Sequence, residues 1–436
     1  MSETAFPEQH QLLKILLEPL RKHLAEAMRQ ADSLCLTTFL VGGVVRDLII
    51  GKHATDLDLV IVGDAISFGR QLSHQYAGEF KYHTRFGTAS VVFPDGVCLD
   101  LATARSERYE HSGALPSVVP SNLTDDLLRR DFSINAMAIG LTGERAGEFI
   151  DPFLGLQDLE NHVIRVLHPQ SFIDDPTRLF RAVRFEQRLG FHLEDTTLGL
   201  FLDAVKGELI RKLTPERLKE QIRLTLQEDH PWAPVSRLYE LNAWNDVFPG
   251  LEVGCDAQRI FSGVENWLAE GRDSKRIDET VVWHLYLLAL ISGCDDSPGS
   301  IEKRLNLETE VRVGIRRLNK MREIEFEVKQ GALKSASGFY TAACGIPDWV
   351  VLYSGIASEV EGMRHLCMNY YLRDRHVRTE IDGHTLESLG IPNGPIYRVI
   401  LDAVLSARLD GDINDEESEV IRALQIWGKK ASQDRH

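Results

Sequence analysis

Two aspartates, Asp56 and Asp58, lie one residue apart in the apolar stretch TDLDLV at 55–60. Strand side chains alternate between two faces, so a strand here would place both carboxylates on one face and Leu57 and Leu59 on the other. Two like charges so close repel each other unless a cation lies between them, and Mg²⁺ is commonly held by one or two carboxylates plus substrate phosphates. The spacing therefore predicts a Mg²⁺ site on Asp56 and Asp58, although a capped turn before a solvated strand face would give the same pattern.

A glycine pair precedes the aspartates at a predicted turn from strand to helix. In FLVGGVVRDL, the strand ends at Val41, Gly42 and Gly43 form the turn, and the helix opens at Val44. Backbone N–H groups at such a turn approach an anion closely, and the helix N-terminus favours negative charge. Arg46, in the first helical turn, could reach the same anion. Beside an aspartate pair, this turn indicates a triphosphate held next to its metal.

A third carboxylate, Asp100, lies in the predicted strand VCLDL. If this strand lies beside the first one, Asp100 would complete a carboxylate cluster that activates an attacking hydroxyl. A simple hydrogen-bond acceptor at a strand end explains Asp100 equally well, and both interpretations stay open.

A predicted helix that starts at Asp175 carries several arginines on one side. Asp175 suits the N-cap and Pro176 the first helical position. At about 100° per residue, the arginines share one face of the helix: Arg178, Arg181 and Arg184, with Arg188 beside them. Arginine donors and a carboxylate acceptor on a rigid helix can pair with the Watson–Crick edge of cytosine or adenine. A solvated or salt-bridged helix face is the alternative.

Length, composition and charge exclude several classes of protein. The chain has 436 residues, 43% of them apolar, and a net charge of −16, which argues against indiscriminate coating of nucleic acid but allows a local basic site. No stretch approaches the roughly 20 apolar residues that span a membrane, and the N-terminus lacks the pattern of a secretory signal. The six cysteines form no CxxC pair. We therefore expect a cytoplasmic protein without a membrane partner.

The pattern of predicted elements changes near residue 150. Before it, short β-rich runs alternate with helices; after it, helical periodicity dominates. This pattern predicts an α+β fold with a small mixed sheet in the N-terminal part and an all-α remainder. Proline- and glycine-containing stretches such as KLTPER and SGCDDSPGS suggest further boundaries. The expected segments are a catalytic domain 1–150, a nucleotide-selecting helical domain 151–213, a helical body 214–293 and an RNA-binding tail 294–436.

Three stretches carry a resemblance to a known family. LVGGVVRDLIIGKHATDLDLVIVG, RRDFSINAMA and DDPTRLFRAVRFEQRLGF occur in this order over roughly residues 35–190. Together they resemble the bacterial-type tRNA nucleotidyltransferases and poly(A) polymerases of the polymerase-β superfamily. The resemblance implies an N-terminal nucleotidyltransferase domain of the polymerase-β type.

The resemblance also implies roles for single residues. Asp56 and Asp58 would bind the metals, whereas Arg129 and Asp131 would be supporting ion-pair partners. The remaining matched positions would contact the nucleotide: Gly43, Arg46, Arg130, Asp175, Arg178, Arg181 and Arg184.

The expected reaction is template-independent addition of nucleotides to the 3′ acceptor end of tRNA, using ATP and, for complete CCA addition, CTP. The 3′-hydroxyl would attack the α-phosphate with the help of Mg²⁺, and pyrophosphate would leave. The stretch SGALPSV is closest to A-adding members, for which a separate enzyme would add the two cytidines. The alternatives are complete CCA addition, a poly(A) polymerase, a catalytically silent RNA-binding homologue, or transfer to a small molecule.

Overall fold

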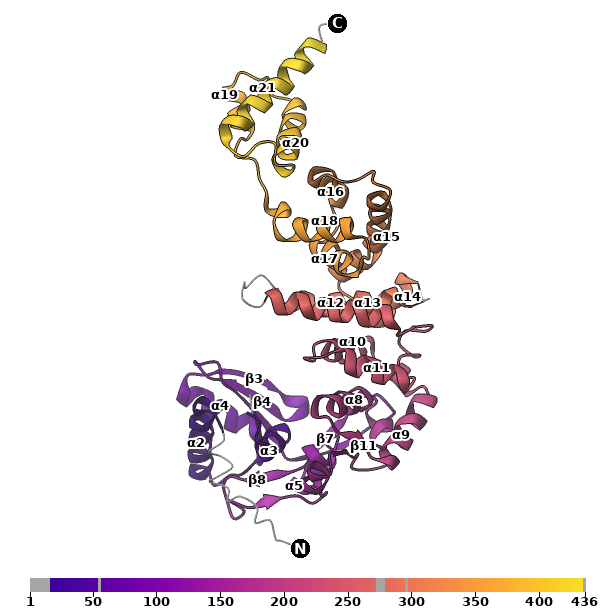
Figure 1. Ribbon diagram of the computed structural model, residues 1–436. Helices are drawn as coiled ribbons and strands as arrows, with labels where there is room; N and C mark the ends of the chain where they lie inside the picture. The colour runs from indigo at the N-terminus through magenta and orange to yellow at the C-terminus, as the bar shows by residue number, and fades with distance from the viewer. Residues whose placement is uncertain (1–15, 54–55, 272–278, 295–296, 434–436) are drawn as a thin grey trace. The chain divides into compact units, whose positions relative to one another are not determined.

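The computed structural model of the protein describes residues 16–53, 56–271, 279–294 and 297–433 (Figure 1). The chain divides into two compact units. Unit 1 comprises Met1–Glu228 and Ala233–Val247, and unit 2 comprises Asp229–Trp232 and Phe248–His436. No helix of the described residues is long and apolar enough to cross a membrane.

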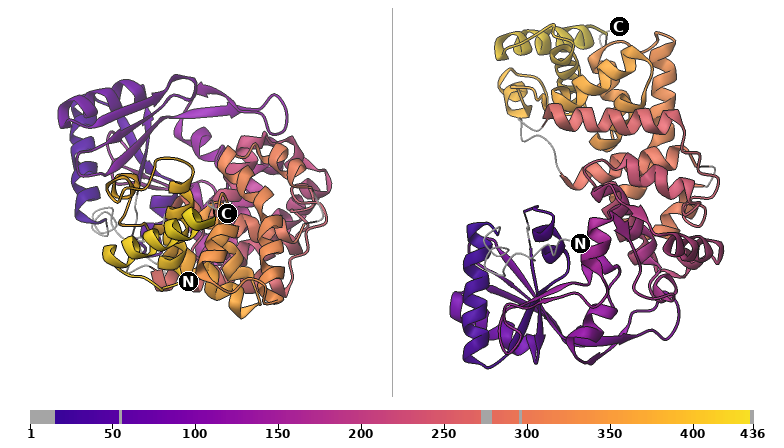
Figure 2. Two further views of the ribbon diagram at one scale, coloured as in Figure 1. Left: turned by 90° about the horizontal axis from the view of Figure 1, so that it is seen from above. Right: turned by 60° about the horizontal axis from the view of Figure 1, so that its bottom comes forward.

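A seven-stranded mixed sheet forms the centre of the N-terminal part of unit 1 (Figure 2). Its strand order is β3-β4-β5-β2-β1-β8-β9, and β2 runs parallel to β5 whereas the other neighbours are antiparallel. The strands are β1 Thr37–Val41, β2 Leu57–Val62, β3 Glu79–His83, β4 Thr88–Val92, β5 Cys98–Thr103, β8 Ala138–Gly140 and β9 Phe149–Ile150.

The two faces of this sheet differ in polarity. Along β2, Leu57 and Leu59 are almost fully buried, whereas Asp56 is exposed and Asp58 is half-buried. Helix α4 (Ala65–Tyr76) packs on β4 and β5. It begins where the Asp64 carboxylate accepts hydrogen bonds from the N–H groups of its first turn. The predicted alternation along TDLDLV is therefore confirmed.

The remaining elements of unit 1 surround the sheet and extend the chain beyond it. Two strand pairs lie outside the sheet, β6 with β7 and β10 with β11. The strands are β6 Arg105–Arg108, β7 Ser117–Pro120, β10 Val163–Ile164 and β11 His192–Leu193. The helices are α2 Glu18–Ser33, α3 Gly43–Ile49, α5 Leu123–Leu128, α6 Gly155–Glu160, α7 Ser171–Asp174, α8 Thr177–Leu189, α9 Asp195–Lys206, α10 Pro215–Leu226 and α11 Trp232–Glu240.

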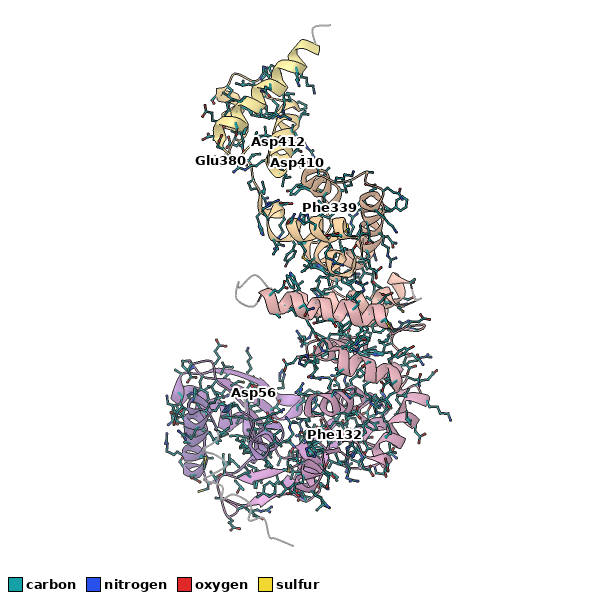
Figure 3. The ribbon with its side chains drawn as sticks, in the orientation of Figure 1. Asp56, Phe132, Phe339, Glu380, Asp410 and Asp412 are labelled. Atoms are coloured by element: carbon teal, nitrogen blue, oxygen red, sulfur yellow. The ribbon has the colours of Figure 1, made fainter. Side chains whose placement is uncertain are left out.

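Unit 2 is helical throughout its described residues. Its helices are α12 Cys255–Gly271, α13 Glu279–Ser292, α14 Pro298–Leu305, α15 Thr309–Lys329, α16 Ala336–Ala343, α17 Asp348–Ala357, α18 Glu361–Leu372, α19 Gly383–Ser388, α20 Ile396–Leu409 and α21 Glu416–Gln433. Among the labelled side chains of Figure 3, Asp410 lies at the end of α20, and its carboxylate accepts hydrogen bonds from the N–H and hydroxyl of Ser337. The predicted fold class, a mixed sheet with helices followed by a helical remainder, is confirmed.

A buried histidine joins α2 to the turn between β4 and β5. His23 contacts Glu26 through Nδ1 at 2.8 Å and Asp95 through Nε2 at 2.7 Å. Its ring stacks on Phe93 with 3.8 Å between ring centroids. The hydrogen bond with His23 holds the pKa of Asp95 below its usual range. This contact anchors the hairpin whose second strand carries Asp100.

Replacement of Asp95 by asparagine should destabilise unit 1 at pH 7 because it removes the charged partner of His23. The pKa of Asp95 is lower in the folded than in the unfolded state, so its stabilisation is complete above the unfolded value of about 4 and disappears as the pH falls through the folded value. Urea unfolding at pH 7 and pH 3 measures the difference. Asp95→Asn should unfold earlier than the wild type at pH 7, and the gap between their midpoints should be smaller at pH 3. Equal midpoints at pH 7 for Asp95→Asn and the exposed control Asp32→Asn would contradict this role.

Candidate active site

Three aspartates lie on the polar face of the sheet, because the strand that carries Asp100 does lie beside the strand of Asp58. Asp58 on β2 is the register partner of Asp100 on the parallel strand β5, and Asp56 directly precedes β2. Burial raises the pKa of Asp58; the positive charge of Arg130 opposes this shift, and the charges of Asp100 and Asp56 add to it. The three carboxylates are thus close enough to act on one another electrostatically. A cation beside Asp58 would relieve this repulsion.

The donor set fits a divalent metal held partly by its substrate. Carboxylate oxygens are the ligands that Mg²⁺ prefers, and one or two of them suffice when phosphates supply others. Within the part of the chain that the structure describes, no three histidine, cysteine, aspartate or glutamate side chains converge into a metal site of their own. Asp100 is further engaged with Ser90, whose hydroxyl donates to Asp100 Oδ1 at 2.5 Å. Asp56 and Asp58 therefore remain the residues best suited to hold a metal.

The glycine turn lies directly beside Asp58. Gly42 has φ +80°, in the region that disfavours residues with a side chain. A Cβ atom at Gly42 would lie 2.8 Å from Arg130 Nη1 and 3.4 Å from Asp58 Oδ2, and one at Gly43 would lie 3.5 Å from Arg46 Nη2. Only glycine at position 42 therefore lets the turn, a guanidinium and a carboxylate approach so closely.

Two arginines flank this turn. Arg46 is buried, donates to Asn135 Oδ1 at 2.7 Å and also pairs with Asp47. Arg130 donates from Nη2 to Asp126 Oδ2 at 3.1 Å, whereas its buried Nε has no acceptor among the described residues. Arg130 thus carries positive charge beside Asp58 without being fully paired. Such a donor suits an anionic ligand.

Helix α8 presents the predicted arginines, but acidic residues from distant segments pair with several of them. Arg181 donates from Nε and Nη2 to Asp131 Oδ2 at 2.8 and 2.5 Å. Arg184 and Arg188 both bind Glu228, with their shortest contacts at 2.7 and 2.5 Å. The salt-bridged alternative therefore holds for these three arginines, whose acidic partners lie in distant segments of the chain.

The partners of Arg178 are neutral oxygens. Arg178 is buried and donates to Ser171 Oγ and to the carbonyl oxygen of Arg129, both at 2.6 Å.

Burial disfavours the charged carboxylate of Asp131, but the charge of Arg181 prevails and holds the pKa of Asp131 below its usual value. The arginine face is thus fixed by polar contacts before any ligand binds.

The start of α8 differs slightly from the prediction. The helix begins at Thr177, with Pro176 as its N-cap residue, instead of having Asp175 in that role. The Asp175 carboxylate still accepts from Thr177 N at 3.0 Å, and it also accepts from Arg217 Nη2 at 2.7 Å. Asp175 is therefore both a helix-start acceptor and the partner of an arginine from α10.

One cavity of about 500 Å³ brings most of the predicted residues together. The predicted residues in its lining are Gly42, Gly43, Arg46, Asp58, Arg130, Asp175, Arg178 and Arg181. Asp56 and Asp100 lie outside this lining on the sheet face, and Arg184 is instead held at Glu228. The cavity thus brings the Asp58 carboxylate and the Gly42–Gly43 turn together with a set of guanidinium groups.

The sequence analysis missed five residues of this cavity: Glu107, Tyr109, Pro116, Asn135 and Phe185. The Phe185 ring lies 5.0, 5.4 and 5.7 Å from the guanidinium carbons of Arg46, Arg181 and Arg188. Glu107 accepts hydrogen bonds from Tyr109 at 2.8 Å and from Arg129 at 3.1 Å. Phe185 lies among the arginines in the stretch FRAVRF, and this local pattern could have identified it as a residue of the cavity. No local pattern in the sequence indicated Glu107 and Tyr109, because they reach the cavity from the separate β6–β7 segment.

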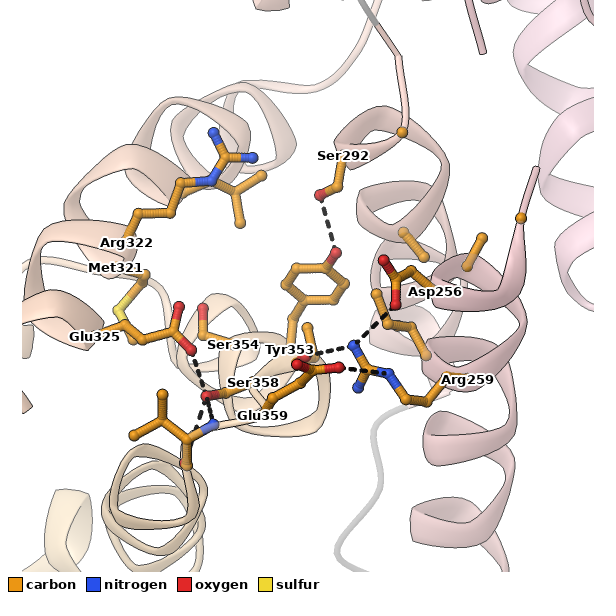
Figure 4. Close-up of a pocket in the computed structure, with 18 of the residues that line it drawn as sticks. Asp256, Arg259, Ser292, Met321, Arg322, Glu325, Tyr353, Ser354, Ser358 and Glu359 are labelled. Atoms are coloured by element: carbon orange, nitrogen blue, oxygen red, sulfur yellow. Dashed lines mark hydrogen bonds and ion pairs between the residues drawn. The ribbon is translucent and has the colours of Figure 1, made fainter. Parts of the chain in front are cut away.

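Unit 2 contains a larger cavity of about 1030 Å³ (Figure 4). Tyr353 and Ser292 share a hydrogen bond of 2.9 Å on its wall, and Arg259 lies 3.8 Å from Asp256 and 3.7 Å from Glu359. None of the predicted site residues lines it. Its size therefore does not make it the active site, because it lacks the aspartate cluster and the glycine turn.

Comparison with known sequences places the chain among nucleotidyltransferases. The family described as the poly A polymerase head domain matches residues 38–165. The A-adding tRNA nucleotidyltransferase of Geobacter sulfurreducens is 35% identical over 96% of this chain, and that of Halalkalibacterium halodurans is 31% identical over 99%. The chain spans 48% of the length of the first relative and 95% of the second.

Solved structures show the same fold over most of the chain. A CCA-adding enzyme in its apo form II is 30% identical, with a TM-score of 0.80 over 96% of this chain and 98% of that one. The Thermotoga maritima CCA-adding enzyme complexed with tRNA is 28% identical, with a TM-score of 0.74 over the same shares. A CCA-adding enzyme complexed with ATP has a TM-score of 0.77 at 28% identity, again over 96% and 98%. The aspartate-bearing sheet, the arginine helix and these likenesses agree: the chain belongs to the tRNA nucleotidyltransferase family that contains the poly A polymerase head domain.

Proposed function

We propose that this enzyme adds the terminal adenosine to the 3′ end of tRNA, with ATP as the nucleotide donor. The observation that carries this proposal is the position of Asp58, Arg130 and Gly42 at one end of an arginine-lined cavity. A nucleoside triphosphate needs this combination of an acidic metal site, an open backbone turn and cationic side chains. The two relatives that cover nearly the whole chain are A-adding enzymes, which supports adenosine over cytidine.

In the proposed complex, the phosphates lie at the Gly42–Gly43 turn, where Arg130 offers a guanidinium beside Asp58. Asp56 and Asp58 would hold Mg²⁺; enzymes of this family are normally metal-dependent, and carboxylates favour Mg²⁺. When bound, the metal would neutralise the triphosphate and lower the pKa of the RNA 3′-hydroxyl. The protein's own contribution is to hold the α-phosphate in line with that hydroxyl.

The proposed base site lies along α8. Asp175 can accept from an exocyclic amine, and Arg178 and Arg181 can donate to ring acceptors of the base. A base with another donor pattern leaves buried groups unpaired, at a cost of about 1–3 kcal/mol for each group. We infer that Asp175, Arg178 and Arg181 read the base, whereas Arg184 supports the helix through Glu228.

The other parts of the chain complete the proposal. Segments 1–150, 151–213, 214–293 and 294–436 would act as catalytic, nucleotide-selecting, body and RNA-binding domains. A cytoplasmic location, where tRNA is repaired, fits this role, and a separate CC-adding enzyme would supply the preceding cytidines. Complete CCA addition is the second candidate, because the similar solved structures are CCA-adding enzymes.

Three tRNA substrates separate these functions. The purified protein is incubated with tRNA that ends before CCA, after C or after CC, and with ATP, CTP or both. We expect ATP-dependent extension by one nucleotide, only on tRNA ending in CC. Full repair of the shortest tRNA would establish CCA addition instead, long adenosine tails on unrelated RNA would identify a poly(A) polymerase, and no extension of any RNA would reject the proposal.

Asp58→Asn should lower kcat for adenosine addition by at least about 100-fold, because it removes a metal ligand at the reacting phosphate. The same change should leave the thermal unfolding temperature unchanged or raise it. The raised pKa of Asp58 means that its charge opposes folding above the unfolded-state value of about 4. Activity within about twofold of the exposed control Asp203→Asn would contradict the assignment.

Gly42→Ala and Gly51→Ala form a matched pair that separates backbone strain from crowding of the site. Both glycines have positive φ, +80° and +73°, but only at Gly42 would the new methyl group meet the site, whereas nothing lies within 4 Å at Gly51. Both variants should lose stability, by about 1–3 kcal/mol. Steady-state kinetics should show an increase of roughly tenfold in KM for ATP in Gly42→Ala alone, because Arg130 must move. Equal KM values in the two variants would show that the turn does not hold the nucleotide.

A further inference from the structure

The sheet has a polar face on β3, β4 and β5 that continues the aspartate cluster. On β4 and β5 the residues facing α4 are buried, among them Ala89, Val91 and Leu99. Their neighbours on the opposite face are half-buried or exposed: Thr88, Ser90, Cys98 and Asp100. On the edge strand β3, the same face carries Glu79, Lys81 and His83, all exposed. Hydrophobic burial therefore does not explain this face.

Strand register connects β3 to the candidate active site. Lys81 is opposite Ser90, Ser90 is opposite Asp100, and Asp100 is opposite Asp58. Residues in register on neighbouring strands point to the same face. The hydrogen bond of 2.5 Å between Ser90 and Asp100 shows this directly. One row thus runs from the aspartates to a lysine, over three strand spacings of about 4.8 Å, or about 14 Å.

In the strand order, the row and the Gly42–Gly43 turn lie on opposite sides of β2, because β5 borders β2 on one side and β1 borders it on the other. The cavity lining includes Asp58 but no residue of β3, β4 or β5. An in-line attack requires the incoming hydroxyl to approach opposite the departing pyrophosphate. If the triphosphate occupies the cavity, the attacking RNA end must therefore approach over Asp100 and the strands beyond it.

We propose that this polar face seats the 3′-terminal nucleotides of the RNA substrate and that Lys81 contacts a backbone phosphate upstream of the reacting hydroxyl. This inference rests on the proposed function. Phosphate is the group that an exposed lysine recognises best on RNA, and Lys81 forms no ion pair with a carboxylate of the described segments. Glu79 flanks it on the same face, so a single phosphate fits beside Lys81 better than a long stretch of backbone. Ser90 would act as a positioning residue that orients Asp100.

The test compares Lys81→Ala with Lys22→Ala, an exposed lysine of α2 that lies outside this face. Binding of fluorescent tRNA ending in CC is measured by anisotropy at several salt concentrations, together with KM for tRNA and for ATP. Lys81→Ala should weaken tRNA binding about fivefold and reduce the slope of log Kd against log salt by about 0.7–0.9, the share of one phosphate contact. KM for ATP should stay constant, and Lys81→Arg should restore binding in part.

The outcomes distinguish this inference from the proposed function. If the wild type adds adenosine but Lys81→Ala binds tRNA with the affinity and salt slope of Lys22→Ala, the RNA does not cross this face and only the inference is wrong. If the wild type extends no tRNA, the proposed function itself fails. A rise in KM for ATP instead of tRNA would place Lys81 at the triphosphate and would also overturn the inference. Circular dichroism and thermal unfolding show whether both variants are folded.

Discussion

The burial of the Asp58 carboxylate among other charged groups is the constraint on which the site depends. The side chain is held beside the charges of Asp56 and Asp100, and its pKa is raised chiefly by burial. The protein keeps this unfavourable arrangement because Leu57 and Leu59 fix the strand from the other face, where both are buried. The charged carboxylate of Asp58 therefore lies where a bound metal and triphosphate would reduce its repulsion from the neighbouring aspartates. Relief of this unfavourable charge would contribute to the binding energy of the substrate.

Three arginines of α8 are already ion-paired, whereas Arg178 has only neutral partners. Asp131 binds Arg181, and Glu228 binds Arg184 and Arg188. Asp131 also accepts from Phe132 N and Asn135, and Asn135 in turn binds Arg46. The contacts thus run from the helix to the glycine turn without interruption. Donors fixed in this way need little rearrangement when a ligand arrives, which favours selective recognition of one base.

Local patterns in the sequence predicted a large part of this site. The alternation in TDLDLV, the Gly42–Gly43 turn and the arginine spacing each follow from strand or helix periodicity, and the structure has all three. The family resemblance implied that Asp131 is an ion-pair partner, but no local pattern indicated its pairing with Arg181 or that of Glu228 with Arg184, because these residues lie 50 and 44 positions apart. The register that places Asp100 beside Asp58, and Ser90 beside Asp100, also depends on strand order, which no single stretch of sequence encodes. The contact between Arg217 and the Asp175 carboxylate was likewise not predictable, because the two residues lie 42 positions apart.

The central claim is that a triphosphate binds between the glycine turn and the aspartates, with its base along α8. A crystal structure of the protein with Mg²⁺ and a non-hydrolysable ATP analogue tests it most directly. The account predicts metal density at Asp56 and Asp58, phosphates at Gly42 and Gly43, and adenine within hydrogen-bond distance of Asp175 or Arg178. Nucleotide bound instead in the larger cavity of unit 2, beside Tyr353 and Arg259, with no metal at Asp58, would contradict it.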